Sequence, residues 1–383
     1  TEKEDWSSLT AAAAAGGVTT VLDMPNTVPA VDSAEVLEAK VAIAEAKAGV
    51  DFGLWGLVRA GSTESMLEGL AAGGAVGFKA YLGYAFRLSK RQVLYTPDAL
   101  DPDLEPPPDY GTLARLLPAV ARLGLPLAVH AEDPSVLAAF RSPISGYADL
   151  LASRPAVAEA VAIAAAGVLA QRTGAHLHVV HLSSSLGLRA AKDAVRAGAR
   201  LSLETAPQYL WLTEADFERV GTAMKMLPPV RTAPDRAALR EALAEGAVQM
   251  VATDHAPHTD AEKALPLEEA PAGSPGVQTL YLSCLELARQ LGDLSQAVRW
   301  CAEQPALFMN LYPRKGAIQE GADADLVVLD PGGTTRIRAA DMRSRQRNSA
   351  LEGLEAHFAI KEVLLRGEPP GAGRGRFVRP AAR

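Results

Sequence analysis

The residues best suited to chemistry lie on four apolar, strand-like runs. Lys79 lies inside one run, and His130, His181 and Asp254 each come at the end of a later run. Catalytic groups gather at the carboxyl ends of parallel barrel strands, so we expect these side chains to lie close together. Imidazole and carboxylate ligands without a thiolate suit zinc, with manganese or cobalt as alternatives. The blander interpretation is an ion pair for Lys79 and satisfied core imidazoles for the histidines.

Lys79 is the least expected of these residues, because a lysine inside an apolar strand is costly unless its charge is paired or removed. Carbamylation by CO₂ removes the charge and turns the amine into a carboxylate-like bridge between two metal ions. A hydroxide held between two such ions is a strong nucleophile at neutral pH. Asp254 is the predicted catalytic residue, since it can bind one ion and also carry the proton of the attacking water to a leaving nitrogen.

The most specific motif is the stretch Val251–Thr259, Val-Ala-Thr-Asp-His-Ala-Pro-His-Thr. It delivers Asp254, His255 and His258 together at the end of a short apolar run. A strand followed by a helix cap, with the histidines on the surface, is the alternative interpretation of this stretch alone.

Strand-like and helical stretches alternate along most of the chain, which predicts parallel strands joined by crossover helices. The predicted strands cover 18–24, 51–58, 76–82, 126–132, 176–183, 200–207 and 248–255. The fold class is therefore α/β, a (β/α)8 barrel of the TIM type, with seven strands counted and the first one missing. We expect the barrel domain to cover 1–314, a small β-sandwich appendage 315–368, and a poorly ordered Gly/Pro/Arg-rich tail 369–383.

Bulk composition narrows the class of partner. The net charge is −7 with the two signs interspersed, which argues against nucleic acid and anionic membranes. No apolar run of membrane-spanning length or signal peptide is recognised in the sequence. The two cysteines, Cys284 and Cys301, indicate no disulfide framework. We therefore expect a cytoplasmic protein that acts on small molecules.

These motifs resemble a known family, the cyclic amidohydrolases that include dihydroorotases, allantoinases and dihydropyrimidinases. The resemblance runs over nearly the whole chain, and its opening part rests on Lys3-Glu-Asp5, Gly16-Gly-Val-Thr-Thr20 and Met24-Pro-Asn-Thr27. Lys79 matches the carbamylated lysine of the family, His130 and His181 match two histidine ligands, and Asp254 matches the metal-binding catalytic aspartate. The Asp-His-Ala-Pro-His-Thr motif favours dihydroorotases.

The resemblance also implies substrate contacts and partners. Residues matching Asn26 and His258 help to hold a substrate carboxylate in that family, and backbone groups matching Ala272 and Gly273 touch the pyrimidine ring. The implied cofactor is a pair of Zn²⁺ ions, or other divalent ions, bridged by Lys79. The implied substrate is a small cyclic amide, most of all dihydroorotate interconverting with N-carbamoyl-L-aspartate, and we expect a homo-oligomer, a dimer or tetramer.

Three departures from the family pattern keep alternatives open. The His-x-His pair of the first strand is absent, which fits either a truncated record or a non-catalytic, dihydroorotase-like scaffold. Leu227 stands where many dihydroorotases carry a substrate-binding asparagine. Two stretches resemble allantoinases as much as they resemble dihydroorotases, namely Glu204–Leu210 and 154–188. Allantoinase and hydantoinase/dihydropyrimidinase activities therefore stand as the alternatives to dihydroorotase.

Overall fold

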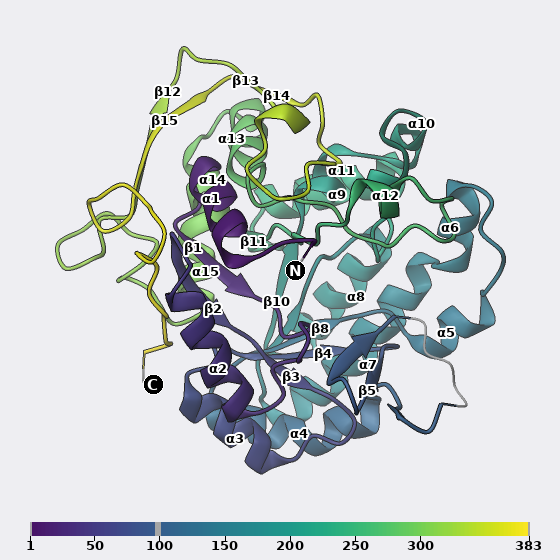
Figure 1. Ribbon diagram of the computed structural model, residues 1–383. Helices are drawn as coiled ribbons and strands as arrows, with labels where there is room; N and C mark the ends of the chain where they lie inside the picture. The colour runs from purple at the N-terminus through teal and green to yellow at the C-terminus, as the bar shows by residue number, and fades with distance from the viewer. Residues whose placement is uncertain (1, 96–100, 382–383) are drawn as a thin grey trace.

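Parallel strands form the wall of a barrel in the computed structural model, which describes residues 2–95 and 101–381 (Figure 1). Each strand is short and apolar, as expected for strands covered on both faces. The predicted run 51–58 is divided into two strands around Trp55. The barrel strands are β1 (Thr20–Asp23), β2 (Asp51–Leu54), β3 (Gly56–Val58), β4 (Phe78–Tyr81), β8 (Leu127–His130), β9 (Leu177–Val179), β10 (Leu201–Thr205) and β11 (Met250–Val251).

The strands follow one another around the wall in sequence order. β1 pairs with β2, and a second run has the order β11-β10-β9-β8-β4-β3, with all pairs parallel. Within the described residues, no strand pairs with the outer edge of β1 or with the outer edge of β11. The place predicted for a first strand is therefore open, and the barrel fold expected from the sequence is confirmed.

Helices cover the outside of the barrel between successive strands (Figure 1). Their ends follow capping rules: Asp109 accepts a hydrogen bond from the Thr112 amide at the start of α4, which stops at the left-handed Gly124. The longer helices are α1 (Trp6–Ala15), α2 (Ala34–Glu45), α3 (Glu64–Gly73), α4 (Tyr110–Leu123), α7 (Ala156–Thr173), α8 (Ser185–Arg196), α11 (Ala233–Ala244) and α13 (Leu280–Leu291). The shorter ones are α5 (Pro134–Ala139), α6 (Tyr147–Ser153), α9 (Pro207–Trp211), α10 (Phe217–Val220), α12 (Asp260–Lys263), α14 (Ser295–Val298) and α15 (Gln304–Phe308).

The stretch Tyr147–Thr173 is long and apolar enough to cross a membrane by length and composition alone. Here it forms α6 and α7, and α7 packs against α8 and α4 on the outside of the barrel. Helices that line a barrel core pass the same test of composition, so this stretch is explained by its packing.

The appendage consists of two antiparallel strand pairs. β12 (Leu326–Asp330) pairs with β15 (Ala359–Leu364), and β13 (Thr335–Arg336) pairs with β14 (Glu355–Ala356). A buried ion cluster joins its first residues to the barrel, because Lys315 Nζ lies 2.6 Å from both Asp51 and Asp325 and 3.0 Å from Asp323. The domain boundaries themselves stay a prediction.

The segment 369–381 departs from the poorly ordered tail predicted above. Gly375 N donates to Ala48 O at 2.8 Å, Phe52 N donates to Arg376 O at 3.0 Å, and Val378 N donates to Phe52 O at 2.8 Å. This segment therefore runs along β2 as a further short piece of barrel wall, on the side where β4 has not yet begun. Its Gly/Pro/Arg composition conceals two apolar side chains, Phe377 and Val378, which pack into two different hydrophobic clusters. Residues 382 and 383 of the predicted tail lie outside the described residues.

Candidate active site

Two of the predicted ligands meet at the carboxyl end of the barrel. His130 ends β8 and His181 follows β9, and His130 Nδ1 lies 3.0 Å from His181 Nε2. Burial, aided by neighbouring positive charges, lowers the pKa of His130 to about 4 and that of His181 well below its ordinary value. The two imidazoles are therefore neutral at pH 7, the state in which ring nitrogens bind cations.

The second nitrogen of His130 is fixed by a carboxylate. His130 Nε2 lies 3.0 Å from Glu132 Oε2 and 3.2 Å from the hydroxyl of Tyr84. Arg154 in turn holds Glu132 through its Nε, at 3.1 Å, and through a second guanidinium contact. Metal-binding histidines commonly donate their other N–H to a carboxylate, which sets the tautomer and the ring orientation. In this arrangement Nδ1 is left as the free lone pair of His130.

Lys79 lies in the middle of β4 with its side chain inside the barrel. It is 2% exposed, and its Nζ has no hydrogen-bond partner among the described residues. Nζ lies 4.6 Å from the centre of the Tyr81 ring. Burial lowers the pKa of Lys79 to about 7, although the negative charges of Glu204 and Asp254 oppose this shift. A substantial neutral fraction at pH 7 makes the amine a nucleophile for CO₂.

Asp254 lies three residues after the end of β11, in a strained conformation. Its φ of 47° lies in the left-handed region, as does the φ of 43° at His181, and residues other than glycine rarely adopt it. Such strain clusters at functional sites. Burial raises the pKa of Asp254 to about 7, with a further contribution from Glu204 and an opposing one from Lys79. Gln208 Nε2 approaches the Asp254 carboxylate at 3.4 Å.

These donors fit divalent metal ions in their chemistry. Lys79 Nζ and His181 Nδ1 are buried polar atoms without hydrogen-bond partners, and the His130 and His181 nitrogens face each other. Across residues 2–95 and 101–381, however, no three His, Cys, Asp or Glu side chains converge closely enough to hold an ion by themselves. A ligand set of the predicted kind therefore needs Lys79 in addition to these residue types.

The two histidines of the 251–259 motif are held on both sides. His255 Nδ1 accepts hydrogen bonds from the amides of Gly276 and Val277, and its Nε2 lies 3.5 Å from Glu4. His258 Nε2 lies 3.0 Å from the Ala272 carbonyl, and its Nδ1 lies 2.9 Å from Lys3 Nζ. Both rings thus bridge the amino-terminal residues and the loop 272–277.

The remaining predicted substrate contacts are placed separately. Asn26 Nδ2 donates to the hydroxyl of Tyr95 at 3.3 Å, and Leu227 is partly buried against the core. Gly273 has a φ of 131° and lies so close to Ala256 that a Cβ would come within 2.4 Å of its carbonyl oxygen. Only glycine fits there. The structure brings Ala272 to His258, whereas within the part of the chain that the structure describes no hydrogen bond joins Asn26 to either of them.

Comparison with known proteins identifies the family. The sequence profile of the amidohydrolase family matches residues 1–369. The chain belongs to the amidohydrolase family. It is 37% identical over 390 residues to an allantoinase from Streptomyces avermitilis, across 100% of this chain and 83% of that relative. It is 36% identical over 372 residues to a dihydroorotase from Halobacterium salinarum, across 95% of this chain and 81% of that relative.

A solved structure supports the same assignment. The L-hydantoinase (dihydropyrimidinase) from Arthrobacter aurescens is similar with a TM-score of 0.89 and 29% identity, covering 99% of this chain and 84% of that one. The family and the enzyme class predicted from the sequence, an amidohydrolase, are confirmed. Amidohydrolases are in general metal-dependent enzymes.

Several residues of the amidohydrolase site were not predicted from the sequence. Tyr84 contacts His130, and its ring centre lies 4.6 Å from that of Tyr95, which contacts Asn26. Both tyrosines belong to a small sheet of β5 (Ala85–Arg87), β6 (Gln92–Leu94) and β7 (Leu104–Glu105), or lie next to it. Glu132, in the motif His-Ala-Glu-Asp, offered one usable signal, because a carboxylate two residues after a strand-end histidine lies on the same face.

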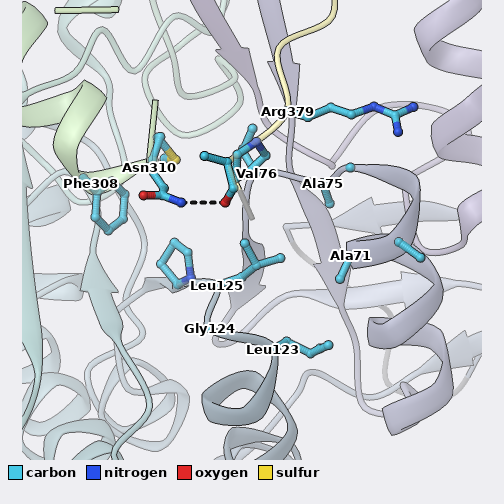
Figure 2. A pocket seen from close by; sticks show the side chains of 15 residues that line it. Ala71, Ala75, Val76, Leu123, Gly124, Leu125, Phe308, Asn310 and Arg379 are labelled. Atoms are coloured by element: carbon cyan, nitrogen blue, oxygen red, sulfur yellow. Dashed lines mark hydrogen bonds between the residues drawn. The ribbon is translucent and has the colours of Figure 1, made fainter. Parts of the chain in front are cut away.

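A separate pocket lies at the other end of the barrel. It has a volume of about 230 Å³ and is lined by residues that precede β4 and β8, among them Ala75, Val76 and Leu125 (Figure 2). The amide of Asn310 donates to the Ala381 carbonyl at 2.6 Å on its rim. Because it lies at the amino-terminal ends of the strands, this pocket is remote from Lys79, His130, His181 and Asp254.

Proposed function

We propose that this amidohydrolase opens or closes the ring of a small cyclic amide by metal-assisted hydrolysis. The observation that carries the proposal is the meeting of His130 Nδ1 and His181 Nε2 at 3.0 Å, with both rings neutral and the outer nitrogen of His130 fixed by Glu132. His130 Nδ1 carries a lone pair, and His181 Nε2 can donate to it or, once deprotonated, join it in holding a shared cation.

Within this proposal each residue has a distinct part. His130, His181, Asp254 and a carbamylated Lys79 would hold two zinc ions or other divalent ions, which supply Lewis acidity and lower the pKa of water. Asp254 moves a proton from the attacking water to the leaving ring nitrogen. The left-handed backbone at Asp254 presents its carboxylate at the end of β11, where Gln208 steadies one oxygen.

Dihydroorotate is the ring that we propose first, with N-carbamoyl-L-aspartate as its open form. The 251–259 motif and the dihydroorotase relative support it. Allantoin is the second candidate, and two observations favour it. The allantoinase relative is as similar as the dihydroorotase relative, and both ring nitrogens of His258 are already engaged, one with Lys3 and the other with Ala272. A role for His258 toward a substrate carboxylate requires its N–H to leave Ala272. A hydantoin or dihydropyrimidine ring is the third candidate, since the similar solved structure is a hydantoinase.

The test is a side-by-side assay of the purified protein with dihydroorotate, allantoin and hydantoin, with and without added zinc. The variant Asp254→Asn serves as the matched control. Zinc-dependent ring opening that disappears in this variant supports the proposal and ranks the rings. Turnover that depends on neither zinc nor Asp254 would contradict the proposal. Zinc binding without turnover would favour the alternative of a non-catalytic scaffold.

Two further expectations from the sequence join this proposal. We propose a cytoplasmic location and a homo-oligomer, a dimer or tetramer. Size-exclusion chromatography with light scattering distinguishes these assemblies from a monomer of 40.2 kDa.

A further inference from the structure

We propose that Lys3 holds His258 in its neutral Nε2–H tautomer and, through this ring, positions the loop that carries Ala272 and Gly273. Lys3 is then a positioning residue and His258 a strut between two backbone segments. The contacts of Lys3 and His258 carry this proposal whether or not the protein turns over a substrate, and only the kinetic part of the test rests on the proposed function.

The tautomer follows from the chemistry of the two partners. A lysine ammonium can only donate, so the His258 Nδ1 atom, 2.9 Å from Lys3 Nζ, must carry a lone pair. A carbonyl oxygen can only accept, so the Nε2 atom, 3.0 Å from Ala272 O, must carry the proton. The two contacts together allow one protonation state, the neutral Nε2–H ring. Burial and the charges of Lys3 and Lys263 lower the pKa of His258 to about 4, which agrees with a neutral ring.

Lys3 is itself fixed in place. Its Nζ lies 2.9 Å from Glu262 Oε1, and the other oxygen of Glu262 accepts from the Thr259 amide at 3.0 Å at the start of α12. Carboxylate and imidazole therefore take two of the three ammonium hydrogens. Because Lys3 connects residues 255 positions apart in the sequence, it ties the amino-terminal segment directly to the strand-end loop.

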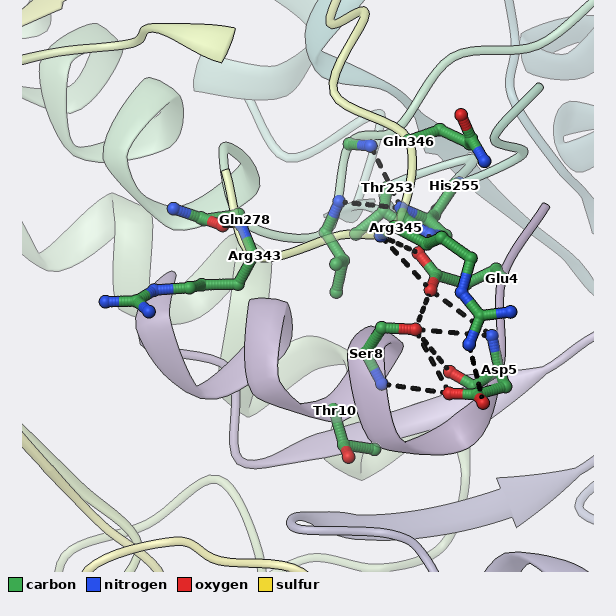
Figure 3. Close-up of polar contacts among 12 residues, drawn as sticks. Glu4, Asp5, Ser8, Thr10, Thr253, His255, Gln278, Arg343, Arg345 and Gln346 are labelled. Carbon is green, nitrogen blue, oxygen red and sulfur yellow. Dashed lines mark hydrogen bonds and ion pairs between the residues drawn. The ribbon is translucent and has the colours of Figure 1, made fainter. Parts of the chain in front are cut away.

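The segment around Lys3 is anchored on its other side by the appendage (Figure 3). Arg345 contacts Asp5 at 2.9 Å and its amide reaches the Glu4 carboxylate, while Gln346 donates to the carbonyl of Glu2 at 2.8 Å. Asn348 completes the link, because its amide donates to the His258 carbonyl at 2.9 Å. Contacts with the appendage therefore fix the amino-terminal segment in place, and Lys3 links this segment to the His258 ring.

The loop that His258 supports has little freedom of its own. Gly273 N donates to Lys225 O at 2.9 Å, and Ala256 N donates to Ser274 O at 3.1 Å. The Ala272 carbonyl belongs to the same peptide group as the Gly273 amide, and it is held by the His258 ring. Loss of Lys3 would therefore loosen the carbonyl side of the Ala272–Gly273 peptide, while the Gly273 amide keeps its hydrogen bond to Lys225 O.

The test uses the full ¹⁵N-labelled chain and the variants Lys3→Met and Lys3→Arg, with Lys47→Met as an exposed control. Long-range ¹H–¹⁵N spectra report the imidazole tautomers, and His258→Asn assigns the signal. We expect a single Nε2–H form in the wild type, in Lys3→Arg and in Lys47→Met. In Lys3→Met we expect a tautomer mixture and amide exchange at Ala272 and Gly273 faster by about three- to ten-fold. A wild-type ring protonated on Nδ1, or an unchanged ring in Lys3→Met, would overturn the proposal.

Kinetics add a second readout if the proposed activity is found. A positioning role predicts that Lys3→Met raises KM for dihydroorotate and allantoin by a similar factor, about three- to ten-fold, with kcat little changed. A rise confined to dihydroorotate would overturn the positioning role, because Lys3 would then contact the substrate carboxylate. Absence of turnover would contradict the proposed function, while the spectra would still decide the role of Lys3.

Discussion

Two buried lysines of this amidohydrolase differ in every respect except burial. Lys79 is 2% exposed and has no hydrogen-bond partner among the described residues, whereas Lys315 is 6% exposed and is surrounded by Asp51, Asp323 and Asp325. Burial lowers the pKa of Lys79 to about 7. For Lys315, burial acts in the same direction, but contacts with Asp325 and Asp51 outweigh it and raise the pKa.

Under the proposed function, this difference separates a lysine that serves chemistry from a lysine that serves structure. A buried ammonium is costly when it has no counter-ion, so a fold that retains one gains something other than stability. Groups with strongly shifted pKa values and incomplete pairing cluster at active sites. Lys79, His181 and Asp254 share this character at one end of the barrel, while Lys315 closes a satisfied cluster that fastens the appendage to β2.

The largest expected effect is the loss of turnover in Asp254→Asn. Asparagine keeps the shape of aspartate but cannot accept a proton and is a poorer metal ligand. We expect kcat/KM to fall by about a thousand-fold or more, equivalent to roughly 4 kcal/mol of transition-state stabilisation, with unchanged thermal unfolding. The matched variant Asp51→Asn should instead lower stability. More than a tenth of the wild-type activity in Asp254→Asn would remove Asp254 from the proton-transfer role.

Lys315→Met should lower the free energy of unfolding by about 3–5 kcal/mol, because it leaves the buried carboxylate of Asp51 and the partly buried ones of Asp323 and Asp325 short of a counter-ion. Arg366 still contacts Asp51 and compensates in part. Chemical denaturation followed by circular dichroism measures the change. A loss below about 1 kcal/mol would mean that this cluster behaves like an exposed ion pair, and the contrast with Lys79 would fail.

Glu132→Gln sharpens the comparison at the proposed metal ligands. Glutamine can still accept a hydrogen bond from His130, but it loses the charge that Arg154 and the imidazole share. We expect zinc affinity to fall by about ten- to a hundred-fold. Competition with a chromophoric chelator measures it, and Asp149→Asn, on helix α6, is a control that should bind zinc as the wild type does. Equal affinities in all three proteins would show that Glu132 does not orient His130.

Lys79→Met should leave the fold intact while removing metal. Its free energy of unfolding should match or exceed that of the wild type, by up to about 2 kcal/mol. The reason is that an unpaired buried amine is replaced by an apolar side chain of similar length. Metal content should drop at the same time, and a short carboxylic acid added to Lys79→Ala should restore part of any activity. Unchanged metal content would tell against carbamylation.

The smallest effect concerns alkaline pH. The folded-state pKa of Lys315 is raised above its ordinary 10.5, so its stabilisation is fully present below pH 10.5 and is lost as the pH rises through the folded-state value. Wild-type stability should therefore fall more steeply above pH 10.5 than that of Lys315→Met. Parallel curves for the two proteins would contradict the assignment.

Long, regular elements were predictable because their signal is local. Helix α7 (Ala156–Thr173) occupies the stretch between the predicted runs 126–132 and 176–183, which contain β8 and β9. The three-stranded sheet of β5, β6 and β7 and the wall segment 376–378 were not predicted, because their strands are short and pair with distant residues. Such pairing depends on register and tertiary contact, which propensity does not carry.

The candidate site shows the same contrast between residues that could be predicted and contacts that could not. His130 and His181 could be predicted from strand ends alone, because parallel strands bring those ends together. The supporting contacts could not, since Arg154 reaches Glu132 from beyond α6 and Tyr84 reaches His130 from a turn after β4. The engagement of His258 with Lys3 and Ala272 was also hidden, because it joins three segments that are remote in the sequence.

The wall segment 376–378 has a consequence for synthesis on the ribosome. Its amides and carbonyls pair with β2, whose strand is made more than three hundred residues earlier. At about 5–20 residues per second, the nascent chain waits some tens of seconds with that edge of β2 uncovered. An exposed edge invites pairing with other chains, and the segment 376–378 removes this hazard once it covers β2.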